Sequence, residues 1–171
     1  MMLKQRVVDA LNEQLISEFG ASSQYVAVAV YFDELVLPEL AQFFYHQAEE
    51  ERTHAMKIVR FLLETGCKPI IPATPEVRNE FDSTEDAVQM ALNQEMKVTD
   101  EINNIMRISG EEVDYTTQGF LQWFVNEQVE EVDTMSNLLQ TIRHAGGNLL
   151  WVEDYVRRKP QHGGQAASGA A

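Results

Sequence analysis

At 171 residues the chain fits a single domain with one sizeable core, and its 44% apolar content excludes disorder for the body of the chain. The formal net charge of −14 argues against nucleic acids and anionic membranes as partners, because their phosphates would repel the protein. The same charge favours solubility and the attraction of cations.

Prolines and glycines divide the chain into four long segments of helical periodicity, at residues 3–33, 39–64, 84–109 and 115–145. Asn148 opens a shorter fifth segment, which is predicted to be a helix up to about residue 156. One domain is therefore expected over residues 1–158. Residues 159–171 are expected to form a flexible tail, because the chain ends in small uncharged residues.

The helix ends and the connections predict how these segments are arranged. Ser83 and Asp114 are N-cap signals, and Gly146 suits a C-terminal cap. The first and third connections are short, so the flanking helices should form antiparallel hairpins. The second connection, at about residues 66–83, is long enough to cross the bundle from end to end. Strand signals are weak, so we predict an all-α protein: a four-helix bundle with a long crossover and a short C-terminal helix.

Each long segment has an apolar seam that should face the bundle core, and each seam is interrupted near its middle by side chains that bind metals. The interrupting residues are Glu18, Glu51, His54, Glu95, Gln128 and Glu131. Glu18 and Glu51 are separated by 33 positions, as are Glu95 and Gln128. His54 and Glu131 follow three residues later, on the same helix face. The two hairpins therefore present matching groups, as an internal two-fold would.

The plain alternative is that these residues are exposed polar side chains. For one glutamate that alternative would be preferred, but four matched interruptions favour burial. Each unpaired buried ion costs several kcal/mol, so four carboxylates would approach the roughly 5–15 kcal/mol stability of a whole domain. Only protons or cations relieve that cost, and no Lys or Arg lies near the cluster on these seams. Carboxylates with one imidazole suit Fe, Mn or Zn, and two facing sets suit two metal ions.

The segments 50–54 (EERTH) and 126–131 (NEQVEE), together with Glu18, Tyr25 and Glu95, resemble the non-haem bacterial ferritins of the ferritin-like di-iron carboxylate superfamily. The resemblance covers about residues 3–158. It implies a ferritin-like fold and an intrasubunit di-iron site.

By this resemblance, Glu18 and His54 would hold one iron and Glu51 would bridge both. Glu95 and Glu131 would hold the second iron. Gln128 would lie beside the second iron. Tyr25 would hydrogen-bond near the site and donate an electron, although a plain core role for this aromatic residue is equally open.

Ferritins also carry a third iron position. Glu50, Glu127 and Glu130 each precede a member of the core set by one residue, so all three are rotated to the same flank. They are the candidates for a third iron site, and a solvated acidic face is the alternative.

The resemblance further implies iron storage with ferroxidase activity. Fe(II) would be oxidised by dioxygen or hydrogen peroxide, and ferric mineral would be deposited inside a hollow homo-oligomeric shell of 24 subunits. Haem is not expected, because Gln128-x-x-Glu131 and Arg52 stand where haem-binding relatives carry Glu-x-x-His and a methionine. Two other functions stay open: a storage subunit without oxidation, and a di-metal oxygenase or reductase acting on an organic substrate.

The cellular location is predicted from what the chain lacks. Its first residues contain no apolar stretch of a secretory signal, and no apolar run reaches membrane-spanning length. Cys67 is alone and can form no intrachain disulfide. A cytoplasmic protein is therefore expected.

Overall fold

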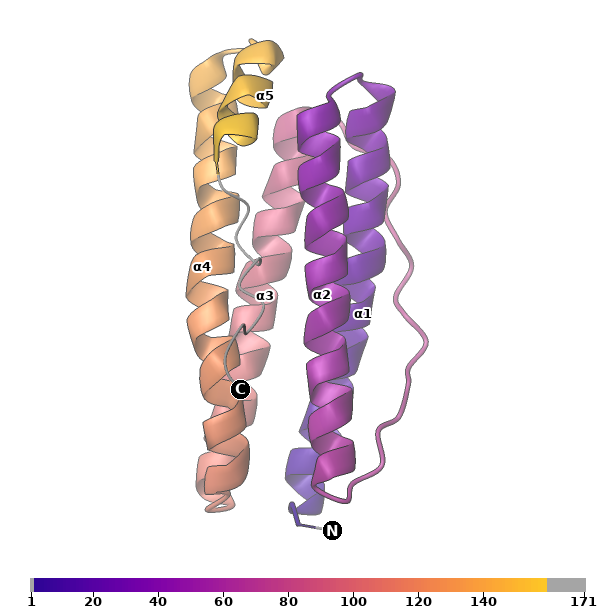
Figure 1. The fold of residues 1–171 in the computed structure, drawn as a ribbon, viewed down its shortest axis with the longest axis vertical. Helices are drawn as coiled ribbons and strands as arrows, with labels where there is room; N and C mark the ends of the chain where they lie inside the picture. Colours follow the sequence, from indigo (N-terminus) through magenta and orange to yellow (C-terminus); the bar gives the residue numbers. More distant parts are fainter. Residues whose placement is uncertain (1, 160–171) are drawn as a thin grey trace, which may run out of the picture.

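The computed structural model describes residues 2–159, which form five helices and no strands (Figure 1). The helices are α1 (Gln5–Glu34), α2 (Pro38–Glu64), α3 (Thr84–Glu111), α4 (Tyr115–Ala145) and α5 (Leu149–Arg158). The predicted all-α class and the five predicted helices are confirmed, and their ends differ from the prediction by at most two residues. Beyond Lys159, the predicted tail lies outside the described residues.

Side-chain caps fix where three of the helices begin. Ser83, Asp114 and Asn148 each accept a hydrogen bond from the backbone N–H three residues later, at the first turns of α3, α4 and α5. Gly146 ends α4 in the left-handed conformation, with a φ of 56°. All four capping predictions are confirmed.

The long connection between α2 and α3 runs beside α1 along the length of the bundle (Figure 1). Hydrogen bonds from α1 hold it in place. Gln24 Nε2 donates to the carbonyl of Arg78 at 2.7 Å, and Arg78 N donates back to Gln24 Oε1 at 2.8 Å. Ile70 N donates to Asn12 Oδ1 at 2.7 Å. The crossover therefore returns the chain to the end where α2 began, so that α2 and α4 are antiparallel.

The bundle core consists of two apolar clusters with a polar layer between them. On α1, Leu15 belongs to the first cluster and Ala21 to the second, and the fully buried Glu18 lies between them in the sequence. The order is the same on α4 and reversed on α2 and α3, and on each of these helices the polar residues separate the two clusters. The apolar clusters bury the surface that stabilises the fold, and they exclude water from the polar layer.

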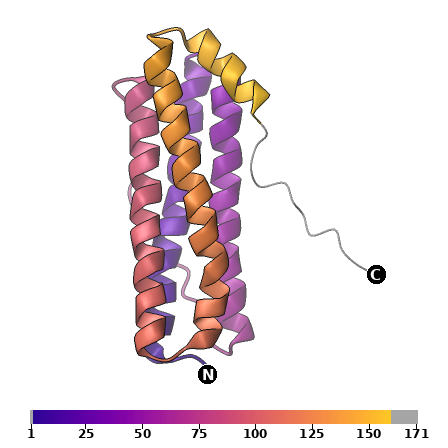
Figure 2. The same ribbon diagram turned by 90° about the vertical axis from the view of Figure 1, so that its left-hand side faces the viewer.

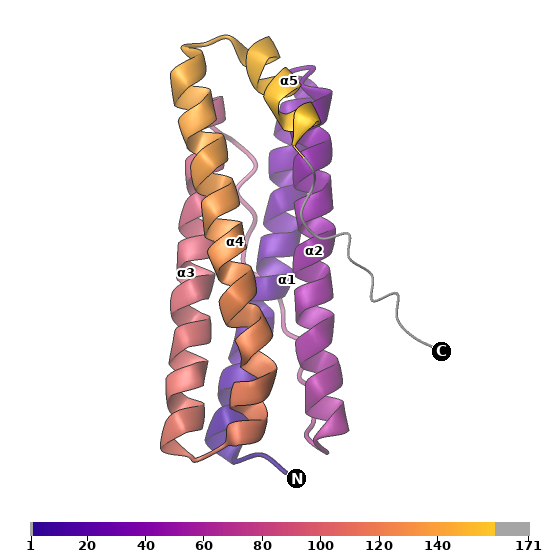
Figure 3. The same cartoon turned by 60° about the vertical axis from the view of Figure 1, so that its left-hand side comes forward.

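The short helix α5 turns back across the end of the bundle where α2 begins (Figures 2 and 3). The buried carboxylate of Glu153 accepts hydrogen bonds from the backbone N–H groups of Glu39 and Leu40, at 2.9 and 2.8 Å. These are unpaired donors of the first turn of α2, so Glu153 both caps α2 and anchors α5. No helix within residues 2–159 combines the length and the hydropathy needed to cross a membrane.

Candidate metal centre

The polar layer gathers side chains from four helices in the middle of the bundle. The six residues that interrupt the predicted seams are each at most 5% exposed, so their predicted burial is confirmed. Glu18 comes from α1, Glu95 from α3, and two i, i+3 pairs come from α2 and α4. The three-residue spacing turns both members of a pair toward the same point.

One half of the layer is formed by Glu18, Glu51 and His54. His54 Nδ1 lies 3.5 Å from Glu51 Oε2 and 3.7 Å from Glu18 Oε2. One potential ligand atom from each of the three residues lies within 4.8 Å of the other two. That arrangement can surround a single metal ion with two carboxylates and an imidazole.

The other half is organised around Glu95. The Tyr25 hydroxyl donates a hydrogen bond to Glu95 Oε1. Gln128 Nε2 donates to Glu95 Oε2 at 3.2 Å and also lies 3.2 Å from Thr99 Oγ1. Glu131 completes this half and is close enough to Glu95 for their charges to interact. A phenol and an amide therefore orient the single carboxylate that α3 supplies.

Three carboxylate oxygens of the layer are buried without a donor. Glu18 Oε2 and both oxygens of Glu51 accept no hydrogen bond from residues 2–159. A buried carboxylate oxygen without a donor is costly, and one of its remedies is a bound cation. Within ion-pair distance, the only cationic side chain that residues 2–159 offer Glu18 and Glu51 is His54.

The electrostatics of the layer favour protons when no metal is bound. Burial raises the pKa of Glu51 and of Glu131, and the charge of Glu95 raises both further. Burial also raises the pKa of Glu95, despite its bonds from Tyr25 and Gln128.

For His54, burial acts in the opposite direction, to lower the pKa. The adjacent carboxylates of Glu18 and Glu51 outweigh burial, and the pKa of His54 is raised. The metal-free centre is thus a cluster of groups that share protons.

Known proteins match this chain in sequence and in fold. The ferritin-like domain family matches residues 8–145. The chain belongs to the ferritin family. It is 44% identical over 160 residues to ferritin BfrB of Mycobacterium tuberculosis, covering 94% of this chain and 88% of the relative. It is 38% identical over 130 residues to a bacterial non-heme ferritin of Staphylococcus saprophyticus, covering 76% and 78% of the two chains.

Solved structures agree with the sequence relatives. An open pore ferritin from the hyperthermophilic archaeon Archaeoglobus fulgidus superimposes with a TM-score of 0.89 at 30% sequence identity. The match covers 93% of this chain and 99% of that one. The resemblance to ferritins and the ferritin-like fold predicted from the sequence are therefore confirmed.

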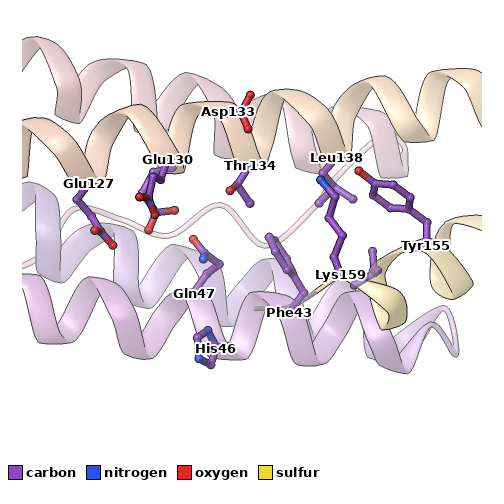
Figure 4. Close-up of a pocket in the computed structure, with 12 residues that line it drawn as sticks. Phe43, His46, Gln47, Glu127, Glu130, Asp133, Thr134, Leu138, Tyr155 and Lys159 are labelled. Atoms are coloured by element: carbon purple, nitrogen blue, oxygen red, sulfur yellow. The ribbon is translucent and has the colours of Figure 1, made fainter. Parts of the chain in front are cut away.

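In this ferritin the three predicted flank residues do not form one group. Glu127 Oε1 lies 3.9 Å from His54 Nε2, and Glu127 forms a potential metal-binding group with His54 and Glu131. Glu50 instead accepts a hydrogen bond from Gln47, and burial raises the pKa of Glu50 to about 7. Glu130 lines the adjacent groove (Figure 4). The third iron site stays a prediction.

Two polar neighbours of the centre had no role in the sequence analysis. Gln14 is 2% exposed, and its Nε2 donates to Glu18 Oε1 at 2.8 Å. Its position four residues before Glu18, which places both side chains on one helix face, was the available signal. Trp123 is 39% exposed, and its ring lies edge-on to the His54 ring with 5.3 Å between centroids. Lys57 Nζ lies 4.3 Å from the centroid of the Trp123 ring. The indole therefore separates His54 from solvent on that side.

Proposed function

We propose that this iron-storage protein oxidises its substrate, Fe(II), to Fe(III) at the buried centre. Two Fe(II) ions would bind, the first to Glu18 and His54, the second to Glu95 and Glu131, with Glu51 between them. The observation that carries the proposal is the set of buried carboxylate oxygens without donors at Glu18 and Glu51, which converge on His54. Bound cations would satisfy these oxygens and offset the cost of the buried charge.

The side chains of the centre bind and orient the ions and exclude water. Anionic oxygen ligands stabilise Fe(III) more than Fe(II), so the ligand set itself favours oxidation. Each Fe(II) gives one electron. Two electrons and two protons reduce dioxygen to hydrogen peroxide, or hydrogen peroxide to two molecules of water. Tyr25 keeps Glu95 oriented, and burial raises the pKa of its phenol, so that the phenol keeps its proton and stays a hydrogen-bond donor to Glu95.

The product requires a storage compartment, which one subunit does not provide. The proposal therefore includes a hollow shell of 24 copies in the cytoplasm, where ferric mineral collects. Its support is membership of the ferritin family and the likeness to the open pore ferritin of Archaeoglobus fulgidus. Sedimentation or light scattering of the purified protein should give the mass of 24 chains, and a monomer or dimer at working concentration would contradict the shell.

Oxygen consumption after addition of Fe(II) alone tests the activity. The wild-type protein should consume oxygen rapidly, and Glu51→Gln should reduce the initial rate by at least tenfold, because both ions lose a ligand. Glu49→Gln is the matched control, since Glu49 lies two residues away on the exposed face of α2. A wild-type protein that binds Fe(II) but consumes no oxygen would be a storage subunit without oxidation. A requirement for an added organic substrate would indicate an oxygenase or reductase.

A further inference from the structure

A groove between α2, α4 and α5 lies beside the centre (Figure 4). It contains about 60 Å³ of space open to water-sized molecules, which is room for a partly hydrated ion. Glu127, Glu130 and Glu131 of α4 line its inner part, and Phe43, Leu138 and Tyr155 line the part near α5. The inner part is therefore acidic and continuous with the centre, and the outer part is aromatic and aliphatic apart from the side chain of Lys159.

Gln47 of α2 projects into this groove from the opposite wall and is only 4% exposed. Its Nε2 donates to Glu50 Oε2 at 2.5 Å, and this bond orients the amide while Glu50 is ionised, because a carboxylate accepts only from the nitrogen. The other amide atom, Oε1, is buried and accepts no hydrogen bond from residues 2–159. A buried carbonyl oxygen of this kind calls for a donor or a cation.

The surroundings of Gln47 Oε1 favour a cation. The oxygen faces α4, from which the Glu130 carboxylate and the Thr134 hydroxyl extend toward it (Figure 4). Gln47 precedes Glu51 by four residues, and Thr134 follows Glu130 by four. Because α2 and α4 are antiparallel, both steps lead one helical turn toward α5. This position therefore lies one helical turn from the buried centre, on the α5 side, and it shares Glu130 with the flank predicted for a third iron.

We infer that the groove binds one further metal cation, with Gln47 Oε1, Glu130 and the Thr134 hydroxyl as its protein ligands. A carbonyl, a carboxylate and a hydroxyl are hard oxygen donors without an imidazole, so the site selects hard ions such as Mn(II), Ca(II) or Fe(III). If the proposed function holds, the natural occupant is iron, and the site holds ions that pass between the centre and the groove mouth.

Crystals of the full-length protein equilibrated with Mn(II) test the site through anomalous scattering. The wild-type protein should show a peak within 2.5 Å of Gln47 Oε1, on the groove side of the amide. Gln47→Met removes the oxygen and keeps the length of the side chain, so the peak should disappear. Gln47→Glu loses the N–H donor to Glu50 but retains a carbonyl-type oxygen and adds charge, so the peak should persist or strengthen.

This pair of variants separates a ligand from a residue that only positions Glu50. If Gln47 acted through its hydrogen bond to Glu50, both variants would lose the ion, and the inference would be wrong. It would also be wrong if the wild-type groove contained only water, or if Gln47→Met retained the peak. Oxygen consumption by the wild-type protein reports the proposed function separately. Rapid oxidation without manganese at Gln47 would overturn this inference alone, and manganese at Gln47 without oxidation would overturn the ferroxidase proposal alone.

Discussion

The hydroxyl of Tyr25 on α1 donates a hydrogen bond to Oε1 of Glu95 on α3, across the middle of the bundle. Both residues are at most 1% exposed, and the same hydroxyl lies 3.3 Å from the carbonyl oxygen of Ala91. Burial and the charge of Glu95 raise the pKa of Tyr25, so the phenol keeps its proton and remains a donor. Tyr25 therefore couples the two hairpins through a group of the metal centre.

Tyr25→Phe removes that donor and leaves a buried carboxylate oxygen unpaired. The free energy of unfolding of the metal-free protein should fall by about 1–3 kcal/mol, the usual cost of such a loss. The initial rate of Fe(II) oxidation should also fall, because Glu95 loses its fixed orientation. Urea unfolding and stopped-flow absorbance measure the two effects. Tyr45→Phe is the control, because the Tyr45 hydroxyl donates a hydrogen bond to the exposed carboxylate of Asp33. The free energy of unfolding should change by no more than about 0.5 kcal/mol in this variant.

Two strained turns extend the internal symmetry of the bundle. Val36 follows Glu18 by 18 residues and Val113 follows Glu95 by 18, and their φ angles are 58° and 57°. In both turns the residue after the valine donates its backbone N–H to the carbonyl of the residue five positions before it. The N···O distances are 3.0 Å after Val36 and 2.8 Å after Val113. A β-branched residue is unfavourable in this left-handed region, which glycine adopts freely.

Val36→Gly should therefore increase the free energy of unfolding, by about 1 kcal/mol, because relief of the strain exceeds the added entropy of the unfolded chain. Leu35→Gly in the same turn is the control. Leu35 has a φ of −82°, so glycine there should destabilise the protein by about 0.5–1 kcal/mol. Chemical denaturation of both variants decides the matter, and equal losses of stability would show that Val36 carries no strain.

Most of the fold, and the burial of the centre, could be predicted because each rests on a repeated pattern. Four apolar seams fix which helix faces meet, and four matched interruptions place Glu18, Glu51, Glu95 and Gln128 in one layer. Connection lengths are enough to separate hairpins from the crossover. Sequence spacing carries less information about side-chain direction. Glu127 and Glu50 share a flank by register, yet one turns toward His54 and the other toward Gln47.

The role of the Gln47 amide could not be predicted from the sequence for a related reason. Gln47 lies at a seam position, and a glutamine there is equally compatible with a satisfied core residue and with a ligand. Only the rotamer shows that one amide atom is bonded and the other is not. The strain at Val36 was hidden as well, because no pattern of residue types requires a valine to adopt a positive φ.

The unequal placement of the flank residues predicts unequal effects on oxidation. Glu127→Gln should slow the first phase of Fe(II) oxidation, because Glu127 lies beside His54 and Glu131. Glu130→Ala should leave that first phase intact and lower only the number of ions bound or the rate of a later phase. Rapid-mixing kinetics with anaerobic Fe(II) titration distinguish these results. A defect in Glu130→Ala as severe as that of Glu51→Gln would show that the helix register of the centre is wrong by one residue.

The metal-free protein should lose stability as the pH rises from about 5 to 8. The pKa values of Glu51, Glu95 and Glu131 are raised in the folded state, and that of Glu50 is about 7, so the folded chain binds more protons than the unfolded chain in this range. His54 acts with the same sign, because its pKa is also raised. The stabilisation from the glutamates is fully present below the ordinary pKa of glutamate, and it is lost as the pH rises through their raised pKa values.

Exposed ion pairs act at a lower pH and do not mask this trend. The pKa of Asp86 is lowered by its bond from Arg78, so its contribution is lost only as the pH falls below the ordinary value of 3.8. Scanning calorimetry in the presence of a chelator should show the melting temperature falling between pH 5.5 and pH 8. Glu51→Gln should flatten the curve, because one of the shared protons is replaced by a neutral amide. A melting temperature that rises over this range would contradict the protonated cluster.

Metal binding should reverse this loss, because the ion takes the place of the protons. Zn(II) tests the coupling without oxidation, since it has no redox chemistry and accepts carboxylate and imidazole ligands. Its binding near pH 7 should release protons, weaken as the pH falls, and raise the melting temperature, because the folded bundle gathers ligands that the unfolded chain scatters. Calorimetric titration in two buffers of different ionisation enthalpy counts the protons. The exposed variant Glu49→Gln should behave as wild type, and Glu51→Gln should release fewer protons and gain less stability. Zn(II) binding to the wild-type protein without proton release or stabilisation would mean that the ion binds elsewhere, and the assignment of the buried layer as the metal centre would fail.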